Sequence, residues 1–156
     1  MAEATLFEVH LHYPANMTQA LPPMADYSRN STLNGVGKTA VAASSPQGFG
    51  GDDARYNPEE FMLMSLSQCH MLTFLAVAAK KQISVLSYTD HATGNLYKAE
   101  NGKMQMERAT LHPCVTVAAG TDTSQLKALH DKAHANCFMS NSVNFPTDIV
   151  DTFAVA

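Results

Sequence analysis

The stretch from Asn57 to Ile83 constrains the fold more than any other part of the chain, because its pattern predicts one long helix. It reads NPEEFMLMSLSQCHMLTFLAVAAKKQI. Asn57 suits the N-cap, Pro58 suits the first helical position, and the two glutamates that follow are favoured by the positive end of the helix dipole. Two lysines occupy the last turn, where cations are favoured. The helix is apolar nearly all round, so we expect it to be buried in a core.

Residues 61–79 approach the length of a membrane-spanning helix, which needs about 20 mostly apolar residues. Polar side chains interrupt this segment at Ser65, Ser67, Gln68, His70 and Thr73. The sequence therefore favours a buried core helix over a membrane span, and we expect no membrane partner.

The remaining segments predict an α+β fold with mainly antiparallel sheet. Before the long helix, residues 4–13 alternate as a strand and residues 14–24 form a turn-rich connection. Asn34-Gly35 predicts a hairpin that returns along residues 38–43, and a Gly-rich loop follows over residues 44–56. After the long helix we expect strands at 84–89, 94–99, 104–111 and 114–119, a turn at Asn101-Gly102, a sheet edge or break at Pro113, a helix at 124–137 and a final strand at 147–155. No repeat or linker interrupts the chain, so residues 1–156 predict a single domain.

The composition narrows the classes of function. The chain is 46% hydrophobic and 15% charged, which is typical of a globular protein. A net charge of −4 gives no reason to expect nucleic acid or an anionic membrane as partner. The N-terminal residues lack the basic and apolar regions of a signal peptide, so we expect a cytoplasmic protein with reduced thiols. In such a compartment a cysteine pair is more often catalytic or metal-binding than structural.

Cys69, halfway along the long helix, has two interpretations. A lone cysteine inside a helix is usually a small packing residue. However, Ser65, Cys69 and Thr73 form one i, i+4 row, so the thiol lies on the least apolar stripe of the helix. Cys137 lies on the inward row of the second helix, and two such helices can bring a cysteine pair within bonding range. Cys114, beside Pro113, has no polar company and is predicted to pack in the core.

A reactive thiol at position 69 needs a cation from elsewhere in the chain. Only the thiolate is a useful nucleophile, and burial disfavours it. The helix N-terminus lies about 18 Å away, beyond the reach of its dipole. The arginines of the chain are Arg29, Arg55 and Arg108, and either of the first two could be folded over the helix. The alternative for each is a solvated surface charge.

A metal site is a rival interpretation of the second helix. His130, His134 and Cys137 have H-x3-H-x2-C spacing, and His70 or Cys69 could complete a tetrahedral set. The paired CxxC knuckles of dedicated zinc modules are absent from the sequence. The alternative is that His130 faces solvent and that His134 is partly buried and orients its neighbours. We therefore assign no metal and no cofactor.

Several motifs together resemble the OsmC/Ohr family of osmotically induced and organic hydroperoxide resistance proteins. They are Asn57-Pro58-Glu59-Glu60, Ser67-Gln68-Cys69-His70-Met71-Leu72, Ala133-His134-Ala135-Asn136-Cys137, Asn141-Ser142-Val143 and the upstream segment YSRNSTLNGVGKTAVAASSP, which contains Arg29. Their order and spacing cover nearly the whole chain. The resemblance implies an OsmC-like fold in which antiparallel sheets wrap long central helices, and an intertwined homodimer.

The resemblance also implies a thiol peroxidase that acts in oxidative stress defence. Cys69 would be the peroxidatic cysteine that reduces an organic hydroperoxide, and Cys137 would resolve its sulfenic acid into a disulfide. An external dithiol, lipoyl or of another kind, would then reduce the disulfide. Arg29 would stabilise the Cys69 thiolate, and Glu59 would hold Arg29 through a bidentate pair.

Glu59 and Cys69 lie about 15 Å apart along one continuous helix. If both serve one site, Glu59 comes from the partner chain, which predicts two composite active sites at a dimer interface. His70 and Met71 stand where the best-known hydroperoxide reductases have Phe, and Phe138 stands where they have Pro, so the substrate range and the reductant are left open. Met62, Met64 and Met71 favour an adaptable apolar pocket for bulky peroxides. A second alternative is a binding protein for small apolar ligands, with a pocket at Cys69 but no turnover.

Overall fold

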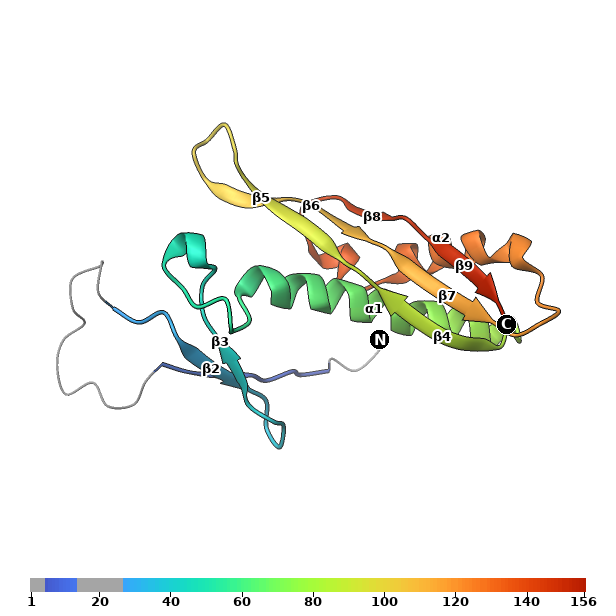
Figure 1. Ribbon diagram of the computed structural model, residues 1–156, viewed down its shortest axis with the longest axis horizontal. Coiled ribbons are helices and arrows are strands. Elements are labelled where there is room, and N and C mark those ends of the chain that lie inside the picture. Colours follow the sequence, from blue (N-terminus) through green and yellow to red (C-terminus); the bar gives the residue numbers. More distant parts are fainter. Residues whose placement is uncertain (1–4, 14–26) are drawn as a thin grey trace. The chain divides into compact units, whose positions relative to one another are not determined.

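The computed structural model describes residues 5–13 and 27–156 (Figure 1). The chain forms two compact units, residues 1–61 and residues 62–156. The connection predicted over residues 14–24 lies outside the described residues. That residues 1–156 act as one domain stays a prediction.

The first unit contains an antiparallel sheet in the order β1-β2-β3, with bounds His10–His12, Ser31–Asn34 and Val41–Ala43. The hairpin predicted at Asn34-Gly35 is confirmed, and it joins β2 to β3. The strand predicted over residues 4–13 is shorter than expected. His10 already pairs with Asn34, the last residue of β2, so residues 5–9 extend past the end of their neighbour.

The Gly-rich loop between β3 and the long helix is folded back on itself. It contains a short 3-10 helix, η1, at Gln47–Phe49. The Ser44 N–H donates to the carbonyl of Tyr56, and Ala43 and Tyr56 form an isolated parallel bridge. A Cβ atom at Gly51 would lie 1.6 Å from the carbonyl oxygen of Ser45, so only glycine fits this close approach.

The long helix, α1, spans Pro58–Lys80 and continues from the first unit into the second. Its predicted N-cap is confirmed as a reciprocal capping box. The Glu60 N–H donates to Asn57 Oδ1 at 2.9 Å, and the Asn57 N–H donates to Glu60 Oε2 at 3.0 Å. The helix ends before Ile83, because Gln82 adopts a left-handed φ of 58° and the Ile83 N–H turns back to the Ala78 carbonyl.

The strands of the second unit form two three-stranded sheets (Figure 1). The sheet β4-β7-β9 comprises Val85–Asp90, Pro113–Val117 and Thr152–Val155, and the sheet β5-β6-β8 comprises Thr93–Lys98, Met104–Leu111 and Thr147–Ile149. The neighbours β4–β7 and β5–β6 are antiparallel, whereas β6–β8 and β7–β9 are parallel. The α+β class with mainly antiparallel sheet is thus confirmed.

One detail of the predicted sheet was wrong. The final strand is not continuous over residues 147–155, because β8 and β9 pair in different sheets on either side of the break. Of the edge or break predicted at Pro113, the break is observed, since β6 ends at Leu111 and Pro113 opens β7, the central strand of the other sheet. The first residue of a strand is a position where the missing N–H of proline is tolerated.

The second helix, α2, spans Leu126–Asn136 and is preceded by a 3-10 turn, η2, at Thr123–Gln125. Asp122 caps this turn by accepting from the Ser124 N–H. The helix was predicted to include Cys137, but that residue has extended backbone angles and is the C-cap. Another 3-10 turn, η3, follows at Ser140–Ser142.

The core of the second unit packs one face of α1 against the sheets and α2. One buried cluster comprises Phe74, Val77, Ala78, Val115, Val117, Leu126, Leu129 and Ala133, and another comprises Leu66, Ala109 and Leu111. The expectation that α1 is buried all round was wrong for the single chain. Leu72 is 56% exposed, and only 28% of the most apolar window of α1 is buried. By length and composition alone α1 could cross a membrane, a test that the core helix of a soluble protein also passes.

Candidate active site

The structure brings Cys69 and Cys137 together within the second unit. Cys69 lies midway along α1 and is half-buried, whereas Cys137 lies at the end of α2 and is fully buried. Cys69 is near enough to Cys137 to raise the pKa of its thiol, and both cysteines are free. The arrangement suits disulfide formation, because two neighbouring free thiols can be oxidised to a disulfide.

The environment of Cys137 favours the protonated thiol. Burial raises the pKa of the Cys137 thiol, while the hydroxyl and N–H of Ser140 lower that pKa and the neighbouring Cys69 raises it. Cys137 is thus a buried thiol, and Cys69 is the more accessible of the two. Cys114 was predicted to pack in the core, but it is exposed on β7.

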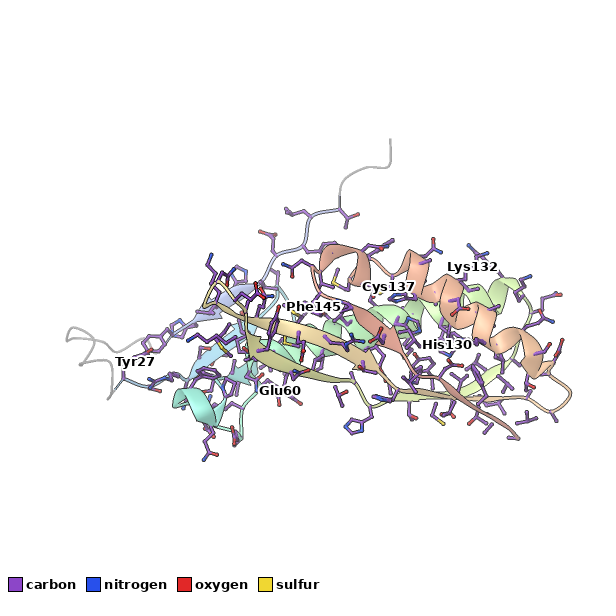
Figure 2. All side chains as sticks on the ribbon, turned by 90° about the horizontal axis from the view of Figure 1, so that it is seen from above. Tyr27, Glu60, His130, Lys132, Cys137 and Phe145 are labelled. Atoms are coloured by element: carbon purple, nitrogen blue, oxygen red, sulfur yellow. The ribbon has the colours of Figure 1, made fainter. Side chains whose placement is uncertain are left out.

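A pair of histidines lies buried between α1 and α2, close in sequence to the cysteines. His70 Nε2 and His130 Nδ1 are 2.9 Å apart, and the two rings are stacked with an interplanar angle of 6°. Burial lowers the pKa of both imidazoles to about 4. With these pKa values both rings are neutral near pH 7. Figure 2 labels His130 within α2 and Cys137 at the end of that helix.

The expectation that His130 faces solvent was wrong, since the residue is 1% exposed. The sequence did contain the signal. Leu126, Leu129, His130 and Ala133 follow an i, i+3, i+4, i+7 row, which is the inward face of a helix. His134 is half-buried, as expected, and its ring centroid lies 6.4 Å from that of His70.

The rival metal site is not supported by the geometry. Among residues 5–13 and 27–156, no group of three or more His, Cys, Asp or Glu side chains could hold a metal ion. The Nδ1 atom of His130 is engaged by His70. The spacing of His130, His134 and Cys137 instead places two histidines against the core and the cysteine against Cys69.

Tyr88 on β4 is a neighbour of the thiols that the sequence did not reveal. Its hydroxyl is buried and has no hydrogen-bond partner in the described part of the chain. Burial raises the pKa of the Tyr88 phenol, and the nearby Asp90 and Cys137 raise that pKa further. The alternating pattern of β4 marked residue 88 only as part of a strand, so nothing local distinguished it.

Arg29 belongs to the first unit. Its guanidinium lies over the ring of Tyr27, 4.4 Å from the ring centroid, and Nη1 donates to the Tyr27 carbonyl at 3.1 Å. A Cβ atom at Gly50 would approach the guanidinium carbon to 2.9 Å, so the loop passes close over Arg29. The other two arginines are engaged elsewhere: Arg55, the second candidate cation, pairs with Asp52, and Arg108 pairs with Asp148.

Arg29 lines an open apolar hollow of about 810 Å³ on the sheet of the first unit. Apolar side chains from the three strands and from the first turn of α1 form most of its wall, including Leu11, Leu33, Val41 and Phe61. Cys69 is not among the lining residues. The pocket at Cys69 that the ligand-binding alternative requires is therefore not this hollow.

Glu59 lies in the first turn of α1, and its Oε2 atom is buried without a hydrogen-bond partner in the part of the chain that the structure describes. Its neighbour Glu60 is instead engaged in the capping box. Arg29 and Glu59 belong to the first unit and the two cysteines to the second. The joint site of Arg29, Glu59 and Cys69 stays a prediction.

A family model described as OsmC-like protein matches residues 50–150, about two-thirds of the chain. This chain belongs to the OsmC-like protein family. The match includes Glu59, both cysteines and the buried histidines, and it confirms the resemblance carried by the sequence motifs. No curated protein matches the chain.

Solved structures confirm the fold of the family. An OsmC-like protein of unknown function from Vibrio cholerae is 32% identical, with a TM-score of 0.85 over 95% of this chain and 99% of that chain. An organic hydroperoxide resistance protein from Elizabethkingia anophelis is 22% identical, with a TM-score of 0.69 over 99% of this chain and 100% of that chain. The organic hydroperoxide resistance protein OhrB of Bacillus subtilis is 15% identical, with a TM-score of 0.62 over 97% and 98%.

Proposed function

We propose that this member of the OsmC-like family is a thiol-dependent peroxidase that reduces organic hydroperoxides to alcohols. The observation that carries the proposal is a pair of neighbouring free thiols of unequal exposure, Cys69 and Cys137. The more accessible thiol, Cys69, would react with the peroxide, and the buried thiol, Cys137, would then react with the oxidised Cys69. Two proteins of the same fold are organic hydroperoxide resistance proteins, which agrees with this chemistry.

In the first step the Cys69 thiolate attacks the terminal oxygen of the hydroperoxide. The O–O bond breaks, the sulfur becomes a sulfenic acid, and the departing alkoxide takes up a proton to give the alcohol. In the second step the Cys137 sulfur attacks the sulfur of the sulfenic acid. The S–O bond breaks, and the leaving hydroxide takes the proton of the Cys137 thiol and departs as water.

An external dithiol then restores the thiols by two exchange steps, and it is itself oxidised to a disulfide. Lipoyl groups are one class of dithiol that fits. No resident cofactor or metal enters this cycle. Since the cycle depends on reduced cysteines between turnovers, we expect the protein to work in the cytoplasm.

Arg29 would stabilise the Cys69 thiolate and orient the peroxide, with Glu59 holding the guanidinium. The buried Oε2 atom of Glu59 supports this role, because a buried carboxylate oxygen without a partner calls for a cationic donor. About 15 Å of helix separates Glu59 from Cys69 on the same chain. We therefore infer a homodimer in which each site takes Glu59 from the partner.

The exposed apolar surface of the single chain supports the dimer. Val9 and Leu11 line the apolar hollow of the first unit and are 81% and 68% exposed. Leu72, on α1 in the second unit, is 56% exposed. Large apolar patches that stay open to water often mark protein–protein interfaces. A second copy of the chain would cover these side chains.

The test is to treat the reduced protein with one equivalent of an alkyl hydroperoxide and to map its peptides by mass spectrometry. We expect the alcohol in stoichiometric yield and a Cys69–Cys137 disulfide. Cys69→Ser should abolish peroxide consumption, while Cys137→Ser should allow one turnover and leave a sulfenic acid on Cys69. Cys114→Ser is the matched control and should behave as the parent protein. Peroxide consumption that survives Cys69→Ser would refute the mechanism.

A further inference from the structure

We propose that the buried hydrogen bond between His70 and His130 positions Cys137 beside Cys69, so that both histidines are positioning residues for disulfide formation. The inference rests on the proposed function for its biological purpose. Its physical content, the alignment of two thiols, is independent of which oxidant reaches Cys69.

The bond joins the two elements that carry the thiols. His70 is the residue after Cys69 on α1, and His130 lies two turns before Cys137 on α2. His70 Nε2 and His130 Nδ1 are 2.9 Å apart in a region where His70 is 0% and His130 1% exposed. A directional bond at this place fixes both the distance between the helices and the rotation of each about its axis.

Aromatic neighbours hold the pair in one orientation. The ring of Phe74 stacks on His130 with centroids 4.2 Å apart, and Phe153 packs near the same ring at 5.5 Å. The side chains of His70 and His130 therefore have little freedom to follow a shift of either helix. A displacement of α2 would break the hydrogen bond rather than bend it.

Stability alone does not account for the pair. Whichever ring donates, His70 Nδ1 and His130 Nε2 remain, and one of them is then an N–H and the other a lone pair. Both atoms are buried without a partner in the described part of the chain. Each unsatisfied buried polar group destabilises the folded state, and two apolar rings of the same shape would avoid that cost. A role in alignment explains why directional rings stand here.

Alignment matters for these thiols because disulfide geometry is narrow. Cys137 is held at the C-cap of α2, where its N–H donates to the His134 carbonyl and its own carbonyl accepts from the Asn141 N–H. It cannot adjust without moving the end of α2. The buried bond to α1 therefore determines whether the two sulfurs meet.

The charged groups that face the pair leave it neutral. Lys127 and Asp131 on α2, Asp90 on β4 and Asp151 before β9 act on His130, while His130 and His134 act on His70. Burial outweighs them, so the pKa of each ring is about 4. At neutral pH both rings are therefore neutral, the N–H of one donates to the lone pair of the other, and the hydrogen bond stays intact.

The experiment compares amide replacements that keep or misplace one atom. The amide of glutamine reaches as many bonds from Cβ as Nε2 of histidine, and the amide of asparagine reaches as many as Nδ1. His70→Gln and His130→Asn therefore keep the hydrogen bond, whereas His70→Asn and His130→Gln, of the same chemistry, lose it. Two independent sites keep the test intact if one variant does not fold.

Each protein is titrated with glutathione disulfide, which needs no peroxidase activity. Cys69 displaces one glutathione thiolate to form a mixed disulfide. Cys137 then displaces the second, and the protein disulfide and two reduced glutathiones result. We expect His70→Asn and His130→Gln to lower the rate at which Cys137 closes the disulfide on the order of tenfold, since a net hydrogen bond is worth about 1 kcal/mol. The rate at which Cys69 forms the mixed disulfide should be unchanged. The bond-keeping variants should stay close to the parent protein.

Loss of stability alone would not separate the closing step from the first step, so this split distinguishes positioning from a merely structural role. Equal closing rates in all four variants and the parent, equal losses in all four, or a parent that forms no disulfide with glutathione would overturn the inference. A parent that closes its disulfide with glutathione but consumes no hydroperoxide would refute the proposed function and leave this inference standing.

Discussion

The two compact units of this chain differ in how far their apolar side chains are buried. In the second unit, Phe74, Leu66 and Val115 are fully buried in clusters built by α1, α2 and the sheets. In the first unit, Val9 and Leu11 are 81% and 68% exposed, and Val36 is 72% exposed. The second unit thus carries its own core. The first has a sheet whose apolar face is left open by the described residues of that unit, and we propose that a partner surface covers and stabilises it.

The largest expected effect tests the core of the second unit. Phe74→Ala removes a fully buried ring that contacts His130 and Tyr88. We expect a loss of about 3–5 kcal/mol in the free energy of unfolding, because the lost burial adds to the cost of a cavity. Denaturant unfolding followed by circular dichroism measures it. If the second unit has its own core, the loss is the same at low and high protein concentration.

Acid is expected to weaken the same core through its histidines. His70 and His130 have pKa values lowered from 6.5 to about 4 by burial, so between these values the unfolded chain binds protons that the folded chain does not. Stability is therefore fully present above pH 6.5 and falls as the pH drops toward 4, by about 3 kcal/mol for each histidine. Unfolding curves across this range measure the slope.

The matched variant for the acid effect is His70→Gln, which cannot titrate. Its slope between pH 6.5 and 4 should be about half that of the parent protein, since one titrating ring remains. An unchanged slope in His70→Gln would show that other groups govern the acid response.

A third prediction tests the dependence of the first unit on a partner. Leu11 lines the apolar hollow of that unit and is 68% exposed. Leu11→Asp would place a charge where a second chain is proposed to pack, and we expect the dimer dissociation constant to rise about a hundredfold. Analytical ultracentrifugation over a concentration series measures it.

Val36→Asp is the control for Leu11→Asp. Val36 is 72% exposed in the same unit but does not line the hollow, so its substitution should leave the dimer intact. A parent protein that is monomeric at all concentrations would contradict the proposed dimer. A dimer unaffected by Leu11→Asp would place its interface on another surface.

How far the sequence predicts the molecule differs between local and distant features. The cap of α1 at Asn57 and the strand over residues 104–111 were predicted with their observed bounds, because both depend on neighbouring residues. The motifs around Cys69 and Cys137 were enough to predict the family.

Features that depend on distant pairing were not accessible in the same way. The contact between His70 and His130 joins positions 60 residues apart, and no local pattern reports which ring faces which. The end of α1 at Gln82 was missed because glutamine rarely adopts the left-handed conformation that glycine usually supplies. The burial of α1 was overestimated because the apolar pattern of a helix does not say whether its own chain or another one covers each face.

The smallest expected effect concerns the first turn of α1, which lies in the first unit although most of the helix lies in the second. Asn57→Ala removes one half of the capping box and should cost about 1 kcal/mol. If the turn unfolds with the second unit, the cost is seen in the global unfolding of the protein. If it opens with the first unit, hydrogen exchange at the Glu60 N–H accelerates while global stability is unchanged. Glu60→Gln, which retains a side-chain acceptor for the Asn57 N–H, is the control and should leave both quantities near those of the parent. Because the proposed site uses Glu59 from this turn and Cys69 from the middle of the same helix, the result determines whether the two residues are held by one cooperative unit or by two.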